Sequence, residues 1–292
     1  MIRSALMNVM TGAALKAGRG LKRDFGEVEN LQVSVKGPGD FVTAADKKAE
    51  KTLFEELSKA RPGYGFIMEE GGVVEGSDQS HTWHIDPLDG TSNFLHGVPI
   101  FAISIALERE GQIIAAVVYN PAIDEMYIAE KGQGAYFNNR RMRVAARRGL
   151  AECMVACGIP PLARQKDHDT FKNELAAGMN KIGNIRRLGA AAIDLAMVAC
   201  GRFDGYWERG VNSWDIAAGI VLVREAGGFV TDLSGGSSML AKGEVCAGNE
   251  MVHRQLLEVM RKLDDDKTPR GDGLASTPRF MGCVLASHIS TH

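Results

Sequence analysis

The sequence predicts a mixed α/β fold, and two patterns along the chain support this prediction. In the first half, two helical stretches are followed by a series of apolar runs of strand length. From about residue 150 onward, short strand-like runs alternate with helical stretches, as expected where helices pack on a sheet. With 292 residues, of which 45% are hydrophobic and 24% are charged, the chain can bury a sizeable core.

Two helices are expected before the first strands. The first lies near the N-terminus, although this basic and mildly apolar segment also fits a transit peptide; its apolar residues at helical spacing are Ile2, Leu6, Val9, Met10 and Ala13. The second runs from Ala44 to about Lys59 and is ended by Pro62-Gly63. The strand-like runs that follow include a hairpin turn predicted at Gly111-Gln112, and they cover Gly65–Met68, Thr82–Ile85, Phe101–Leu107, Ile113–Tyr119 and Met126–Ala129.

The second half repeats a strand-then-helix pattern. Its strand-like runs are Cys153–Ala156, Asp204–Trp207, Phe229–Thr231 and Val245–Ala247. Its helical stretches are Thr170–Met179, Ala190–Cys200, Ser213–Ala226 and Met251–Leu263. A basic link over residues 139–149 marks a candidate boundary, so we expect an N-terminal unit, 1–145, and a C-terminal unit, 146–263. Residues 264–292 have no helical or strand period and are predicted to be a disordered or artefactual tail.

Charge, cysteine content and hydropathy limit the possible partners and location. The formal net charge of -2 gives no global field toward nucleic acid, so no nucleic-acid partner is expected. No run approaches the roughly 18 apolar residues of a membrane span, so no membrane association is expected. An odd number of cysteines without a repeating spacing favours a reducing cytoplasm over a disulfide framework; they are Cys153, Cys157, Cys200, Cys246 and Cys283.

Carboxylates gather beside turn residues in four segments of the chain. These segments are Gly39–Asp46, Glu69–Gly72, Ile85–Thr91 and Asn212–Asp215. Each has a purely structural interpretation: a capping box from Thr43 to Asp46, a turn at the third segment, and a Ser213 N-cap followed by an acid at the fourth.

The third segment carries the strongest single signal for chemistry. An apolar strand, Trp83–Ile85, runs directly into Asp86 and Asp89, and a stiff proline between them lets both carboxylates face one point. Gly90 permits close backbone approach, and the residues from Thr91 onward can open a helix whose free N–H groups suit a phosphate. Carboxylate and carbonyl oxygens prefer Mg²⁺ or a similar hard cation to zinc.

With these motifs the chain resembles the inositol monophosphatase family over roughly residues 1–263. The matching segments are Asp40–Asp46, Glu69-Glu70, Trp83–Phe94, Ser104–Leu107, Trp214–Gly219 and Glu225–Gly228. The resemblance implies a five-layer α/β/α/β/α sandwich of two subdomains, Mg²⁺ as cofactor, sensitivity to lithium, and a homodimer.

The resemblance also implies roles for individual residues. The metal ligands would be the carbonyl of Leu88 and the carboxylates of Glu69, Asp86, Asp89 and Asp215. The catalytic residues would be Glu69 and the pair Thr91 and Asp46, which would activate the attacking water. The substrate would be held by Asp89, Gly90, Thr91, Glu208 and Asp215, with Glu208 contacting substrate hydroxyls and the N–H groups of Gly90 and Thr91 contacting phosphate.

The implied function is Mg²⁺-dependent hydrolysis of a small phosphomonoester, with myo-inositol 1-phosphate as the expected substrate. Direct attack by water is preferred because the chain shows no obvious covalent nucleophile. Fructose 1,6-bisphosphate, histidinol phosphate and a 3′-phosphonucleotide are alternative substrates. A non-catalytic interaction protein that retains the fold is disfavoured, because every expected ligand position holds a carboxylate. A dinucleotide-binding oxidoreductase is disfavoured because Gly132-Gln133-Gly134 lacks the third glycine and the helix of that motif.

Overall fold

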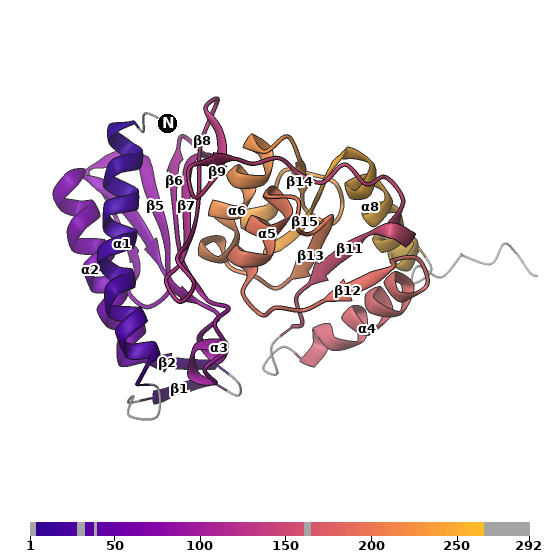
Figure 1. Cartoon of the computed structure of the whole chain (residues 1–292), viewed down its shortest axis with the longest axis horizontal. Coiled ribbons are helices and arrows are strands. Elements are labelled where there is room, and N and C mark those ends of the chain that lie inside the picture. The colour runs from indigo at the N-terminus through magenta and orange to yellow at the C-terminus, as the bar shows by residue number, and fades with distance from the viewer. Residues whose placement is uncertain (1–3, 28–32, 38–39, 161–164, 266–292) are drawn as a thin grey trace, which may run out of the picture.

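The computed structural model describes residues 4–27, 33–37, 40–160 and 165–265 (Figure 1). The predictions made for Ile2, for Cys283 and for the tail beyond Asp265 lie outside the described residues. Among the described helices, none is both long and apolar enough to cross a bilayer.

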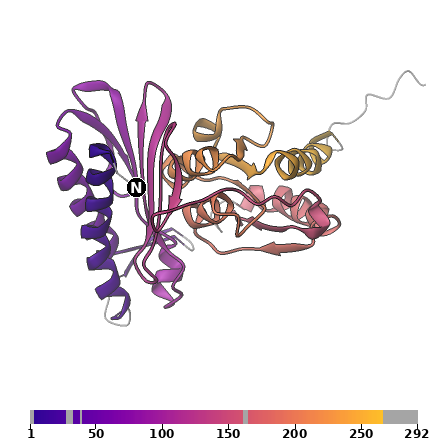
Figure 2. The same ribbon diagram turned by 45° about the horizontal axis from the view of Figure 1, so that its top comes forward.

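Helices and sheets alternate in five layers, which confirms the α/β/α/β/α sandwich (Figures 1 and 2). Helices α1 (Ala5–Phe25) and α2 (Ala44–Ala60) form one outer layer and cover the first sheet. Helices α5 (Ala191–Ala199) and α6 (Ser213–Glu225) lie between the two sheets and contact both. Helices α4 (Gln165–Met179) and α8 (Glu250–Asp265) pack together on the far side of the second sheet.

The first sheet has eight strands. In spatial order they are β10 (Arg140–Arg141), β9 (Gly134–Phe137), β8 (Glu125–Glu130), β7 (Gln112–Asn120), β6 (Ala102–Arg109), β5 (Asp78–Asp89), β3 (Tyr64–Met68) and β4 (Gly72–Val74). All neighbouring pairs are antiparallel except β3 and β5, which run parallel. The β6–β7 turn consists of Glu110 and Gly111, both at positive φ, because Gln112 already pairs with Arg109.

The second sheet has five strands and is mixed. Its spatial order is β12 (Asn184–Arg186), β11 (Met154–Cys157), β13 (Gly205–Arg209), β15 (Glu244–Gly248) and β14 (Phe229–Thr231). The remaining described elements are the hairpin β1 (Val33–Gly37) and β2 (Asp40–Thr43), the short helices α3 (Thr91–Leu95) and α7 (Met239–Lys242), and one 3₁₀ turn at Leu150–Glu152.

Three apolar cores join the layers. The first lies under α1 and α2, the second surrounds α5 and α6, and the third lies between the second sheet and the α4–α8 pair. Helix α1 illustrates the local cause: Ser4 caps it by accepting a hydrogen bond from the Met7 amide at 3.0 Å. Its buried face then repeats every three or four residues through Met7, Met10, Ala14, Ala17 and Leu21.

The predicted long elements are present, whereas several short strands were not predicted. The sequence prediction missed β1, β2, β4, β9, β10 and β12. These strands have two to five residues each, and β4, β10 and β12 are at sheet edges, where few buried side chains impose an alternating pattern. Helix α8 ends at Asp265, two residues later than expected. The division into units at residues 145 and 146 stays a prediction.

Candidate active site

A bulge in β5 brings two aspartates to one face of the first sheet. In a regular strand, residues three apart point to opposite faces. Here Asp86 pairs with Ser104 and Asp89 pairs with Ala102, so three steps on β5 match two steps on β6. The extra residue restores a common face for both carboxylates. The Leu88 amide closes the bulge by donating to Asp86 Oδ1 at 2.8 Å.

The parallel pairing of β3 with β5 places Glu69 beside Asp86. Met68 is in register with Ile85, so the next residue on each strand is an acid. The Glu69 amide donates to the Ile85 carbonyl at 3.3 Å, which continues the ladder by one residue. The sequence places these two acids 17 positions apart, and the sheet makes them neighbours.

The fourth carboxylate comes from the middle helical layer. Asp215 lies in the first turn of α6, where its Oδ2 accepts a hydrogen bond from the Asn212 amide at 2.6 Å. The N-cap of this helix is therefore Asn212, not Ser213 as the sequence suggested. Burial raises the pKa of Asp215 to about 8, and the nearby Asp89 contributes to that rise.

The carboxylate of Asp89 connects β5 to the start of α5. Its two oxygens accept hydrogen bonds from the amides of Ala191 and Ala192, at 3.2 and 2.7 Å. The residue before this helix, Ala190, has no side chain that can cap it, so Asp89 does so from another element. Burial raises the pKa of Asp89 to about 7.

These groups line one cleft of about 380 Å³ between the first sheet and the middle helices. Among the described residues, its wall includes all five of the predicted metal ligands, together with Gly90, Thr91 and Glu208. Asp46 is fully buried behind this wall, where its Oδ1 accepts a hydrogen bond from Thr91 Oγ1 at 3.2 Å. The structure thus brings all the predicted site residues into one region.

The electrostatics and donor set of this cleft fit a hard cation. Burial raises the pKa of Asp86 well above its usual range, and the charges of Glu69, Asp89 and Asp215 add to this rise. A divalent cation among these carboxylates would remove that repulsion. The side chains of the described lining residues offer oxygen ligands, with no imidazole or thiol that would favour zinc.

The carboxylates do not form a closed metal-binding set as they stand. Within the described part of the chain, no group of three or more His, Cys, Asp or Glu side chains is arranged so that it could hold a metal ion. Asp89 and Asp215 instead accept hydrogen bonds from backbone amides. A carboxylate offers about four lone-pair sites, so each can keep its amide and still bind a cation.

Glu208 lies on β13 and lines the same cleft as the β3–β5 acids. Its carboxylate accepts a hydrogen bond from the Tyr206 hydroxyl, and burial raises its pKa to about 7. The two arginines that could have neutralised it at the surface pair elsewhere: Arg209 with Glu174 and Glu244, and Arg202 with Glu125. Glu208 is therefore a cleft acid that neither Arg209 nor Arg202 neutralises.

Gly158 provides the space in which Glu208 lies. A Cβ at this position would overlap the Glu208 carboxylate, so any larger residue must displace that side chain. Gly158 follows β11, and its amide donates to the Trp207 carbonyl at 3.2 Å, which fixes it next to β13. The sequence analysis did not single out this glycine.

Two charged residues of the cleft were also missed. Asp194 on α5 is 1% exposed, and its Oδ1 has no hydrogen-bond partner among the described residues. Burial and the charge of Glu208 raise its pKa well above the usual range, whereas Arg187, also in the cleft wall, opposes this rise. A lone acid within the apolar run 190–200 was a signal that could have identified Asp194.

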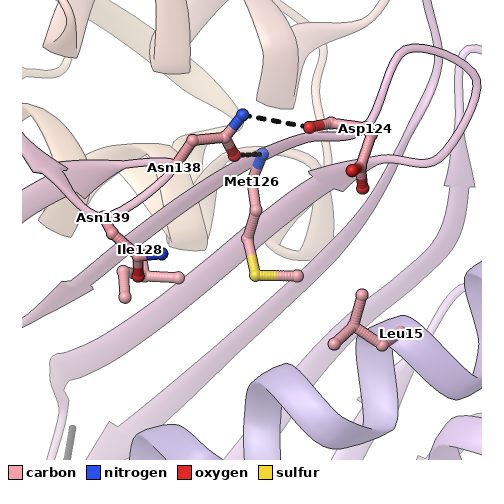
Figure 3. A pocket seen from close by; sticks show the side chains of 6 residues that line it. All are labelled: Leu15, Asp124, Met126, Ile128, Asn138 and Asn139. Atoms are coloured by element: carbon pink, nitrogen blue, oxygen red, sulfur yellow. Dashed lines mark hydrogen bonds between the residues drawn. The ribbon is translucent and has the colours of Figure 1, made fainter.

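A second cavity, of about 250 Å³, lies between α1 and the β8–β9 hairpin (Figure 3). Its polar side chains are used in structural hydrogen bonds. Asp124 accepts from the Tyr119 hydroxyl at 3.0 Å, and Asn138 accepts from the Met126 amide at 2.8 Å and donates to the Asp124 carbonyl at 3.0 Å. Leu15 and Ile128 supply apolar surface, so this cavity lacks the converging acids of the first.

Comparison with known proteins agrees with this geometry. The model of the "Inositol monophosphatase family" matches residues 3–265. An inositol-1-monophosphatase of Mesorhizobium japonicum is 61% identical over 262 residues, which are 90% of this chain and 98% of the relative. The Nus factor SuhB of Escherichia coli K12 is 42% identical over 256 residues, 88% of this chain and 96% of that protein.

One solved structure is similar to this chain in both fold and sequence. The extragenic suppressor protein suhB from Bartonella henselae superposes with a TM-score of 0.86 at 56% identity, covering 89% of this chain and 99% of that one. Fold, cleft and relatives together define an enzyme of the phosphatase class. The chain belongs to the inositol monophosphatase family.

Proposed function

We propose that this enzyme hydrolyses a small phosphomonoester, myo-inositol 1-phosphate in the first place, in a Mg²⁺-dependent reaction with water as the nucleophile. One observation carries the proposal: four acids and a backbone carbonyl line one cleft, and Glu208 lines the same cleft. The name of the Mesorhizobium relative supports the choice of substrate.

The acids would hold Mg²⁺ through Glu69, Asp86, Asp89, Asp215 and the Leu88 carbonyl. When bound, Mg²⁺ supplies Lewis-acid activation of water and neutralises charge on the transferred phosphoryl group. Gly90 has a positive φ of 94°, and Gly90 and Thr91 both line the cleft, where their amides would bind phosphate oxygens. A Cβ at Gly90 would press on the Ile100 carbonyl at 3.0 Å, so this turn requires glycine.

Thr91 would orient the attacking water. Its hydroxyl proton is directed inward, toward Asp46 Oδ1 at 3.2 Å and the Leu88 carbonyl at 3.1 Å. An oxygen whose proton is used in this way still has lone pairs that accept a hydrogen bond from a water in the cleft. Asp46, which is fully buried, would then receive the proton through Thr91.

Replacing Thr91 with alanine should lower turnover by about 10²-fold or more, because positioned proton transfer contributes factors of this size. The Kd for Mg²⁺ should change little, because the threonine side chain is not a metal ligand in this assignment. Turnover at saturating Mg²⁺ and calorimetric titration with Mg²⁺ separate the two effects. A large loss of Mg²⁺ affinity with normal saturated turnover would contradict the assigned role.

The four raised pKa values predict how stability depends on pH. Burial raises the pKa of Asp89 and Glu208 to about 7 and that of Asp215 to about 8, and it raises the pKa of Asp86 well above its usual range, whereas free carboxyl groups have a pKa of about 4. Between about pH 4 and pH 8 the native state therefore binds more protons than the unfolded chain. The free energy of unfolding of chelator-treated protein should fall as pH rises through this window.

Added Mg²⁺ should reverse this trend. Because it binds the ionised carboxylates, its stabilising effect should be larger at pH 8 than at pH 5.5. For a chain of this size, each kcal/mol that Mg²⁺ adds to the free energy of unfolding should raise Tm by about 2–4 °C. Thermal melts at both pH values, with and without Mg²⁺, test the expectation, and a Mg²⁺ effect that is equal at both would contradict it.

The substrate is tested by phosphate release from a panel of phosphomonoesters. The cleft favours a polyol phosphate, because the carboxylate of Glu208 accepts hydrogen bonds from hydroxyls and would repel a second phosphate. Inositol 1-phosphate should give the highest kcat/KM, ahead of fructose 1,6-bisphosphate, histidinol phosphate and a 3′-phosphonucleotide. A higher value for any of these three would reassign the substrate within the same chemistry.

The proposal extends to three further properties that rest on family membership. We propose a homodimer, a cytoplasmic location, and uncompetitive inhibition by Li⁺, which would occupy the hard oxygen site after the leaving group has departed. If Li⁺ does not change the rate of phosphate release, the proposed inhibition by Li⁺ is wrong. The proposed homodimer and cytoplasmic location would be unaffected by that result.

A further inference from the structure

A buried histidine connects the first sheet to the helix that carries Asp215. His84 lies on β5, is 2% exposed, and pairs in register with Ala106 of β6. Its Nε2 is 2.9 Å from Glu108 Oε2, and its Nδ1 is 3.0 Å from Ser213 Oγ on α6. Both ring nitrogens are therefore satisfied, one within the sheet and one across the layer boundary.

The direction of these hydrogen bonds follows from what each group can donate. The hydrogen bond from His84 lowers the pKa of Glu108, and an ionised carboxylate can only accept, so Nε2 carries a proton. In the neutral ring, Nδ1 then accepts the hydroxyl proton of Ser213. This use of the hydroxyl agrees with the finding that Asn212, one residue earlier, is the N-cap of α6.

A second hydrogen bond holds the same turn of α6. Ser104 on β6, which is fully buried, donates from Oγ to the Trp214 carbonyl at 3.1 Å. Two adjacent residues of α6 are thus bonded to two adjacent strands of the first sheet. The contacts lie next to the site acids: Ser213 is two residues before Asp215, and His84 is two residues before Asp86.

From these contacts we infer that the chain Glu108–His84–Ser213 is a positioning element that fixes Asp215 relative to Asp86. Asp215 is the acid that comes from a different layer, so its distance from the others depends on how α6 seats against β5 and β6. The hydrogen bond between the Ser213 hydroxyl and the His84 imidazole lies at the first turn of α6. It would therefore fix both the position of α6 along its axis and its rotation relative to β5. The inference rests on the proposed function, in which these acids share a cation.

The test is the Kd for Mg²⁺, measured by calorimetric titration of the full chain. Ser213→Ala removes one hydroxyl, and it should weaken Mg²⁺ binding by about 5-fold or more, the factor that one hydrogen bond of ordinary strength represents. Ser213→Thr keeps the hydroxyl and should restore binding to within about 2-fold of the original chain. Ser104→Ala should weaken binding in the same direction.

The matched control is Ser58→Ala on α2. It also removes a buried hydroxyl, but Ser58 Oγ has no hydrogen-bond partner among the described residues and lies in the outer helical layer. This variant should bind Mg²⁺ as the original chain does. Circular dichroism and Tm for each variant separate loss of positioning from loss of folding.

Four results would overturn the inference. If Ser213→Ala binds Mg²⁺ as tightly as the original chain, the hydroxyl does not position Asp215. If Ser213→Thr fails to restore binding, or Ser58→Ala weakens it equally, the effect belongs to general stability. If the original chain itself binds no Mg²⁺, the proposed function fails, and this inference fails with it.

Discussion

Replacing Asp86 with asparagine should lower turnover by about 10²-fold or more, equivalent to about 2.7 kcal/mol of activation free energy. Asp86 is 2% exposed and lies at the bulge of β5, among three other acids. Asparagine keeps the side-chain oxygen that accepts from the Leu88 amide, so the bulge should persist. The substitution removes the negative charge that a shared cation requires.

Steady-state turnover at saturating Mg²⁺ measures this effect, and Asp124→Asn provides a matched control. Asp124 lies at the second cavity with φ of 55°, a conformation that asparagine tolerates well. This control should keep the turnover of the original chain. Near-normal turnover of Asp86→Asn would mean that Asp86 is a turn residue only.

Replacing Glu208 with alanine should lower kcat/KM for inositol 1-phosphate by about 10- to 100-fold, because a charge-assisted hydrogen bond contributes roughly 1.5–3 kcal/mol. The same variant should act on an aryl phosphate almost normally, because that substrate has no ring hydroxyls for Glu208 to bind. Glu55→Ala on the exposed side of α2 is the control and should affect neither substrate.

Gly158→Ala gives an independent test of the same site. The added methyl group would overlap the Glu208 carboxylate and displace it, so this variant should reproduce the substrate-selective loss. Gly12→Ala on α1, where a Cβ meets no atom within 4 Å, should be neutral. Equal losses on both substrates would show that Glu208 supports the site in general, and no loss on either would remove it from the site.

Much of the fold was predictable because long elements carry a strong periodic signal. Helix α2 begins at the predicted residue and ends within one, and β6, β7 and β8 lie where apolar runs were found. Short edge strands such as β4 and β10 carry no such signal, because their side chains are exposed and the sheet alone defines them. The positions of these strands depend on hydrogen bonds to distant residues.

The candidate site shows the same division between local and tertiary information. The spacing of Asp86 and Asp89 pointed to the acidic cluster, but only the pairing with β6 explains why both face one side. Asp194 and Gly158 gain their significance from Glu208, which lies 14 and 50 residues away in sequence. Contacts of this kind cannot be derived from local patterns.

The most direct test of the central claim is phosphate release from myo-inositol 1-phosphate by protein treated with a chelator. In the proposed mechanism, removing a cation from among Glu69, Asp86, Asp89 and Asp215 would remove the group that activates water and neutralises the phosphoryl charge. Release should therefore be undetectable in excess chelator and should return when Mg²⁺ is added. Full turnover in excess chelator would contradict the assignment of these acids as a metal site.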